Sequence, residues 1–221
     1  MPRNAAEPPS TRQAVDLRFH GLGRSFGRLR VLHQVEGQVA GGQVLAVTGR
    51  NGAGKSTLLR CLAGLVRPQA GEIVCTVGNG RLDAGGRRRA VGYLAPELGF
   101  YGELTALENL ELLARLRGAE AAAARPLLER LGVPPRRAES ALSSGLRQRL
   151  RWAAALLHRP PILLLDEPVA NLDAQGRRDV MALLAETLDR GAAAVVANPE
   201  ALDLPRVASS LDLGSSAGTS T

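Results

Sequence analysis

The fold of this chain is decided by the stretch Gly49-Arg50-Asn51-Gly52-Ala53-Gly54-Lys55-Ser56-Thr57, which matches the phosphate-binding pattern G-x-x-x-x-G-K-[ST]. An apolar, strand-like run (Val44–Thr48) precedes it, and a helix-like segment (Ser56–Leu65) follows. Glycines let backbone N–H groups converge on phosphate oxygens, and the helix N-terminus adds partial positive charge. The alternative, a chance glycine turn, does not explain this context. The stretch, called the P-loop below, therefore predicts a nucleoside triphosphate site with the Ser56 hydroxyl as a Mg²⁺ ligand.

The basic residues single out one position within this stretch. Lys55 is the only lysine of the chain, so the other 27 of its 28 basic residues are arginine. An ammonium is a compact point charge, whereas a guanidinium is a wide planar fork. The chain uses arginine at every other basic position and lysine only at this one. This choice indicates that the Lys55 ammonium binds between phosphates.

A pair of carboxylates follows the apolar run Ile162–Leu165. Such a run is typical of a buried parallel strand, which would deliver Asp166 and Glu167 to the carboxyl edge of the sheet, where α/β proteins bind ligands. We expect Asp166 to hold Mg²⁺, directly or through water, and Glu167 to orient and deprotonate the attacking water. The alternative is an acidic start to the next helix.

Composition limits the class of protein. The chain has 221 residues, 45% hydrophobic and 22% charged, enough for one large domain with its own core. No apolar stretch is long enough to span a membrane, and the first residues lack the apolar core of a secretory signal. The two cysteines are expected to be buried thiols. The net charge is +7, but the arginines are scattered and only six aromatics are present, so we expect a solvated or membrane-facing basic surface and no nucleic-acid partner.

The order of patterns along the chain predicts an α/β fold. Strand-like runs alternate with helical ones, and a helical insertion occupies about residues 97–157. Within it, Thr105 and Glu108 form a capping-box pattern. Residues 1–13 and 214–221 are polar and are predicted to be disordered tails around one domain at 14–213.

These motifs, taken together, resemble those of the ATP-binding cassette (ABC) ATPases over about residues 15–210. Between the helical insertion and the Asp-Glu strand stands Leu142-Ser143-Ser144-Gly145-Leu146-Arg147-Gln148, similar to the family signature Leu-Ser-Gly-Gly-Gln. The resemblance implies a P-loop NTPase core, a mixed sheet with an antiparallel β subdomain and an inserted helical subdomain. It also implies binding of ATP and Mg²⁺, and a dimer in which Ser143, Ser144 and Gly145 bind the γ-phosphate held by the partner's P-loop.

Other positions follow from the same resemblance. Phe26 stands where the family stacks an aromatic ring on adenine; the alternative is a core phenylalanine. Asn171-Leu172-Asp173 is similar to the loop that couples the two sites of the dimer, and Asp173 matches it. Two positions depart from the family pattern. Glu97 replaces a glutamine that senses Mg²⁺ and the attacking water, and Asn198 replaces the switch histidine, which predicts slow hydrolysis.

Three classes of ABC protein compete. We favour the motor subunit of a membrane transporter, at the cytoplasmic face of the plasma membrane, with membrane-spanning subunits on separate chains and a second ATP-binding subunit, identical or different. Leu98, Phe100 and Tyr101 lie where the family receives the membrane subunit; the alternative is that they are core residues. Glu103–Leu110 resembles the haem-exporter, cytochrome c maturation group, which favours export. The alternatives are a soluble ABC ATPase and a weakly hydrolysing nucleotide-dependent binding module.

Overall fold

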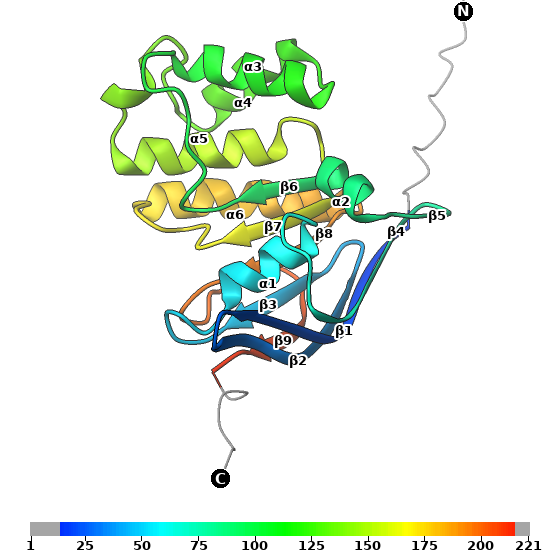
Figure 1. Ribbon diagram of the computed structural model, residues 1–221. Coiled ribbons are helices and arrows are strands. Elements are labelled where there is room, and N and C mark those ends of the chain that lie inside the picture. Colours follow the sequence, from blue (N-terminus) through cyan, green and yellow to red (C-terminus); the bar gives the residue numbers. More distant parts are fainter. Residues whose placement is uncertain (1–13, 215–221) are drawn as a thin grey trace, which may run out of the picture.

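Two sheets and a group of helices build the molecule (Figure 1). The computed structural model describes residues 14–214. Of the predicted tails at 1–13 and 214–221, residues 1–13 and 215–221 lie outside the described residues. The antiparallel sheet has the order β2-β1-β4-β5, with bounds β1 Val15–Phe26, β2 Leu29–Ala40, β4 Ala70–Val77 and β5 Gly80–Arg81. The second sheet is entirely parallel, with the order β6-β7-β8-β3-β9 and bounds β3 Val44–Thr48, β6 Val91–Leu94, β7 Ile162–Asp166, β8 Ala193–Ala197 and β9 Val207–Asp212.

The parallel sheet separates two hydrophobic cores. Every residue of β7 and β8 is buried, as the continuous apolar runs of both strands predict. Side chains alternate between the faces: Leu163 and Leu165 join one core with the helical part, while Ile162 and Leu164 join the other with the helix α1 (Lys55–Leu62) and the antiparallel sheet. Both cysteines are free and buried, as predicted.

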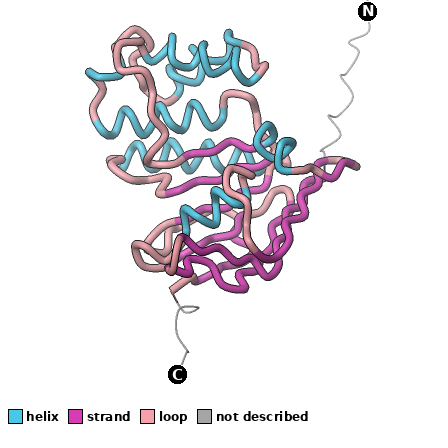
Figure 2. The backbone as a smooth tube through the Cα atoms, viewed as in Figure 1, coloured by secondary structure: helices cyan, strands magenta, loops and turns pink. Residues whose placement is uncertain are grey.

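The helices gather on one side of the molecule in Figure 2, apart from α1 and α2. Their bounds are α1 Lys55–Leu62, α2 Ala84–Ala90, α3 Ala106–Arg117, α4 Ala124–Arg130, α5 Ser144–Leu156 and α6 Ala174–Asp189. The predicted capping box is confirmed, because Thr105 Oγ1 accepts from the Glu108 N–H at 3.2 Å and Glu108 Oε2 accepts from the Thr105 N–H at 2.8 Å. Among the described residues, no helix is both long and apolar enough to cross a bilayer.

Helix α2 and the strands β5 and β9 were not predicted. Helix α2 carries the run Arg87-Arg88-Arg89, and two of these arginines bond the end of the P-loop helix. Arg87 Nε donates to the Leu62 carbonyl at 3.1 Å, and Arg88 Nη1 donates to the Gly64 carbonyl at 2.9 Å. They therefore satisfy carbonyls at the negative end of α1. Strand β9 is exposed along most of its length, so its sequence has no hydrophobic alternation from which a strand could be predicted.

Candidate nucleotide site

The P-loop connects β3 to α1 and curls around the side chain that begins the helix. Lys55 is 6% exposed, and its Nζ donates to the carbonyls of Gly49 at 2.6 Å and Arg50 at 3.1 Å. Gly54 has φ +99°, and a Cβ there would lie 2.8 Å from the Val31 carbonyl oxygen. A residue without a side chain is required at this position, because the loop packs directly on β2. The predicted strand–loop–helix context is confirmed.

A cavity of about 350 Å³ opens beside this loop. Its lining includes Phe26, Asn51, Lys55, Ser56, Thr57 and Glu167. Phe26 is 47% exposed, which excludes the alternative of a core phenylalanine. The Arg24 guanidinium lies 4.7 Å from the centre of its ring, a cation–π contact. The structure thus brings together residues from β1, the P-loop and the end of β7.

Asp166 lies at the end of β7 and is 2% exposed. Its Oδ2 has no hydrogen-bond partner among the described residues. Burial raises the pKa of this carboxyl, a hydrogen bond from Ser56 opposes the rise, and the charges of Glu167 and Glu97 add to it. A buried oxygen without a partner requires an explanation. A hydroxyl and a carboxylate are the hard oxygen ligands that Mg²⁺ prefers, so the residues present fit this ion.

Glu167 has a left-handed backbone, with φ +49°. Its N–H donates to the Ala197 carbonyl at 2.8 Å, and its own carbonyl accepts from Gln148 Nε2 at 3.0 Å. Asn198 lies at the same edge of the sheet, since its N–H donates to the Val47 carbonyl at 3.0 Å. The Asn198 amide donates to the Glu200 carbonyl at 2.8 Å, so a local turn already uses this side chain.

Glu97 is paired with the P-loop helix. Arg60 Nε on α1 donates to Glu97 Oε1 at 3.0 Å. Burial by itself would raise the pKa of Glu97, but the hydrogen bond and charge of Arg60 outweigh it, and the pKa lies below its usual range. Tyr93 lies beside this pair, and burial raises its pKa to about 12. The carboxylate at position 97 is therefore ionised and neutralised by Arg60.

The predicted signature residues lie apart from this cavity. Ser143 and Ser144 are exposed, and Ser143 Oγ caps α5 by accepting from the Leu146 N–H at 3.2 Å. A Cβ on Gly145 would lie 2.9 Å from the Asn171 carbonyl oxygen, so the signature packs closely on the loop that ends at Asp173. Among the described residues, none of these lines the cavity beside the P-loop.

Asp173 and the segment after Glu97 have structural partners of their own. Asp173 caps α6, accepting from the Gly176 N–H at 2.7 Å, and it also accepts from Arg149 Nη2 at 3.2 Å.

In the predicted membrane-facing segment, Leu98 and Phe100 are half-buried against the helical core, whereas Tyr101 is 65% exposed. The core alternative therefore holds for the first two residues and not for Tyr101.

Sequence reasoning missed three polar residues around the site: Arg60, Gln148 and Arg151. Gln148 is 2% exposed and bonds the backbone after β7. Gln148 ends the stretch that is similar to the family signature, but its partner Glu167 is 19 residues away.

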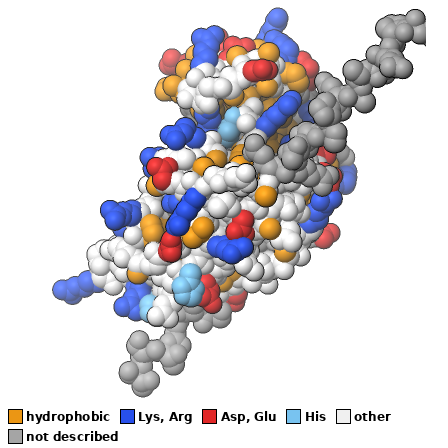
Figure 3. All heavy atoms as spheres, turned by 90° about the vertical axis from the view of Figure 1, so that its right-hand side faces the viewer, with side chains coloured by type: hydrophobic (Ala, Val, Ile, Leu, Met, Phe, Trp, Pro, Cys, Tyr) orange, Lys and Arg blue, Asp and Glu red, His pale blue; other side chains and the backbone are white. Residues whose placement is uncertain are grey.

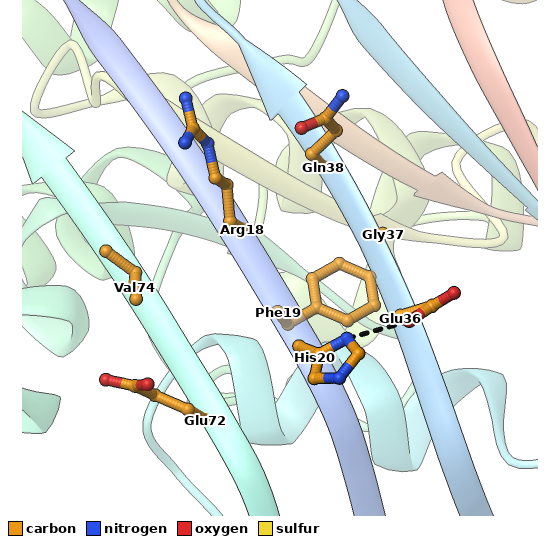
Figure 4. Close-up of a pocket in the computed structure, with 8 residues that line it drawn as sticks. All are labelled: Arg18, Phe19, His20, Glu36, Gly37, Gln38, Glu72 and Val74. Atoms are coloured by element: carbon orange, nitrogen blue, oxygen red, sulfur yellow. Dashed lines mark ion pairs between the residues drawn. The ribbon is translucent and has the colours of Figure 1, made fainter.

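The surface carries a second hollow, of about 380 Å³, on the outer face of the antiparallel sheet (Figure 4). Gly37 and Phe19 are among the residues that line it, and Gly37 leaves room for the buried Phe19 ring, since a Cβ there would lie 2.6 Å from the ring. His20 Nδ1 and Glu36 pair at 2.7 Å beside it, and both side chains are exposed. On the face shown in Figure 3, side chains of both charge signs are interspersed.

Comparison with known proteins agrees with this fold. The family described as ABC transporter matches residues 32–170. The chain is 37% identical over 182 residues to the aliphatic sulfonates import ATP-binding protein SsuB 2 of Pseudomonas fluorescens, covering 81% of this chain and 66% of that protein. It is 36% identical to the macrolide export ATP-binding/permease protein MacB 1/2 of Paracoccus denitrificans (87% of this chain, 30% of that protein). It is 32% identical to the glutamine transport ATP-binding protein GlnQ of Escherichia coli (88% and 85%).

Solved structures support the same fold. An ATP-binding subunit of an ABC transporter matches with 30% identity and a TM-score of 0.73, covering 82% of this chain and 78% of that one. A cassette solved as a dimer in a post-hydrolysis state with ADP and Pi matches with 26% identity and a TM-score of 0.73, covering 83% and 88%. The chain therefore belongs to the ABC transporter family, and its fold is the predicted ABC ATPase fold. It spans 66% and 63% of the length of two sulfonate-import relatives.

Proposed function

We propose that this chain binds and hydrolyses ATP as the motor subunit of an ABC transporter, at the cytoplasmic face of the membrane. The observation that carries the proposal is one cavity that brings Lys55, Ser56 and Glu167 together, with the buried Asp166 beside Ser56. These groups come from two strand ends of one parallel sheet, where nucleotides bind in α/β folds.

Each residue has a role that its position supports. Lys55 and the P-loop N–H groups bind the phosphates, and the exposed ring of Phe26 stacks on adenine. Ser56 and Asp166 would hold Mg²⁺, which when bound neutralises phosphate charge. The Glu167 carboxylate accepts a proton from water as the water oxygen bonds the γ-phosphorus and the bond to the β–γ bridging oxygen breaks. Glu97, which Arg60 holds at 3.0 Å, would sense the metal and the attacking water, and Asn198 would supply a neutral N–H at the same edge.

A second ATP-binding subunit completes the site in this proposal. Ser143, Ser144 and Gly145 are exposed or half-exposed and do not line their own chain's cavity. A second copy, or a different subunit, would present the equivalent residues to the γ-phosphate. Membrane-spanning subunits on separate chains would contact the helical part near Tyr101.

The direction of transport and the substrate stay predictions. Export in the haem-export and cytochrome c maturation group rests on the segment Glu103–Leu110 alone. The curated relatives are named for sulfonate import, glutamine transport and macrolide export. Mass spectrometry of the membrane subunit that co-purifies with this chain from its native membrane decides the question.

The test of the proposed function uses two variants. Glu167→Gln loses water activation but keeps binding, so we expect it to form a dimer by light scattering when ATP and Mg²⁺ are added. Lys55→Ala removes the main charge partner of the outer phosphates, so calorimetry should show no ATP binding and light scattering no dimer. Equal ATP affinity in wild type and Lys55→Ala, or a Glu167→Gln protein that stays monomeric at saturating ATP, contradicts the proposal.

A weakly hydrolysing binding module is the second candidate function. The observation that favours it is the Asn198 amide, which donates to the Glu200 carbonyl and carries no positive charge. ATP binding without measurable turnover, even with the membrane subunit present, would support this function over the first.

A further inference from the structure

The backbone of Glu167 is held from two sides. A left-handed conformation at a residue other than glycine persists only where the surroundings maintain it. On one side, the Glu167 N–H donates to Ala197; on the other, the Glu167 carbonyl accepts from Gln148 at 3.0 Å. Gln148 belongs to α5 and therefore links the glutamate to the helical part of the molecule.

Gln148 is itself fully engaged in hydrogen bonds. Its Nε2 also donates to the Pro168 carbonyl at 3.1 Å, and its Oε1 accepts from Arg151 Nη1 at 3.2 Å. Trp152 Nε1 donates to the same Pro168 carbonyl at 2.8 Å. Arg151 thus orients the amide of Gln148, because an amide whose oxygen is bound must point its NH₂ the other way.

Arg151 extends the chain of bonds to the segment after Glu97. Its Nε donates to the Leu98 carbonyl at 3.2 Å. Leu98 follows Glu97, which Arg60 ties to the P-loop helix, and the same segment continues to the exposed Tyr101. A continuous path of hydrogen bonds therefore runs from Leu98 through Arg151 and Gln148 to the peptide of Glu167.

We propose that Arg151 and Gln148 are positioning residues. They transmit the position of the segment 98–101, which follows Glu97, to Glu167 and so set the rate of ATP hydrolysis. The inference rests on the proposed hydrolysis by this chain. It differs from a general anchoring role of α5, because anchoring would affect stability and nucleotide affinity alike. A relay acts on the orientation of Glu167, so its loss changes kcat while ATP affinity stays the same.

The decisive variant is Arg151→Met, which keeps the aliphatic stem and removes both hydrogen bonds. We expect kcat to fall about tenfold, with KM and the affinity for a non-hydrolysable ATP analogue within about twofold of wild type. Arg151→Lys, which offers one donor group in place of a fork, should recover part of the rate. Arg117→Met is the matched control. Burial lowers the pKa of Arg117 as it lowers that of Arg151, and Arg117 Nη1 likewise donates to a backbone carbonyl, that of Val91, at 3.0 Å.

A double variant tests whether the two residues act in series. With Gln148→Leu already present, adding Arg151→Met should cause no further loss of kcat, because the path is already broken. Independent, additive losses contradict the relay, as does an Arg151→Met enzyme with wild-type kcat or one that loses rate no more than Arg117→Met. A wild type that binds no ATP or shows no turnover instead contradicts the proposed function. Fluorescence of Trp152, the only tryptophan, verifies that each variant is folded.

Discussion

Asp166 is predicted to lower the free energy of unfolding of the nucleotide-free protein, because its position serves metal binding and leaves a buried oxygen without a partner among the described residues. The carboxylate is 2% exposed, its Oδ2 has no partner among the described residues, and burial together with Glu167 raises its pKa. Asp166→Asn removes the charge, while the remaining amide oxygen can still accept the hydrogen bond from Ser56. The variant should therefore be more stable than wild type when neither nucleotide nor Mg²⁺ is present.

The magnitude follows from the single unbonded oxygen. A buried polar group without a partner costs about 1–3 kcal/mol, and the new amide NH₂ recovers part of this by facing the neighbouring carboxylates. A net gain of about 1–2 kcal/mol corresponds to a rise in Tm of about 2–8 °C for a domain of this size. Addition of ATP and Mg²⁺ should reverse the order, because wild type gains binding energy that Asp166→Asn has lost.

Thermal unfolding followed by tryptophan fluorescence, with and without EDTA, measures both effects. Asp83→Asn is the control, since Asp83 is an exposed cap of α2 that accepts from the Gly86 N–H, and asparagine caps a helix about as well. Its Tm should change little in either condition. A nucleotide-free Asp166→Asn protein with a Tm equal to or below that of wild type would refute the reasoning.

Two further predictions concern residues at the edges of the site and of the helical part. Asn198→His should raise kcat and leave KM unchanged, because a histidine adds positive charge near the γ-phosphate; steady-state assays of both proteins check it, and an unchanged or lower kcat shows that Asn198 is a working substitute. Burial and the charge of Arg117 lower the pKa of His158 to about 4 from 6.5, so the folded state binds protons less readily than the unfolded state. Stability should fall as the pH drops from about 6.5 toward 4, by up to about 2 kcal/mol at pH 5. Denaturant titrations at pH 7 and pH 5 should show this loss in wild type and a smaller one in His158→Gln; equal losses contradict the assignment.

The P-loop and the Asp166-Glu167 pair could be predicted because their chemistry is local. Backbone N–H groups of consecutive residues make the phosphate cradle, and an apolar strand followed by two carboxylates needs no distant partner. The same holds for the capping box at Thr105, whose two hydrogen bonds join residues three positions apart. Such features depend on spacing along the chain, which is what a sequence contains.

Other features depended on elements that meet only in the folded chain. Helix α2 and strand β9 carry weak patterns, since one is a short run around three arginines and the other is exposed. Arg87 and Arg88 of this run find their carbonyl partners only because the folded chain places α2 at the end of α1. The pairing of Glu97 with Arg60 joins residues 37 positions apart, and no local rule connects them.

The strand order β6-β7-β8-β3-β9 is what the sequence could not supply. It places the ends of β3, β7 and β8 at one edge, and so brings Lys55, Asp166, Glu167 and Asn198 to the same region. Residue types and spacing determined that this protein has the groups for nucleotide chemistry. Tertiary structure alone decided which hydrogen bonds hold Glu167 and which residues neutralise Glu97, because those contacts arise from packing between segments whose separation along the chain carries no information about their distance in space.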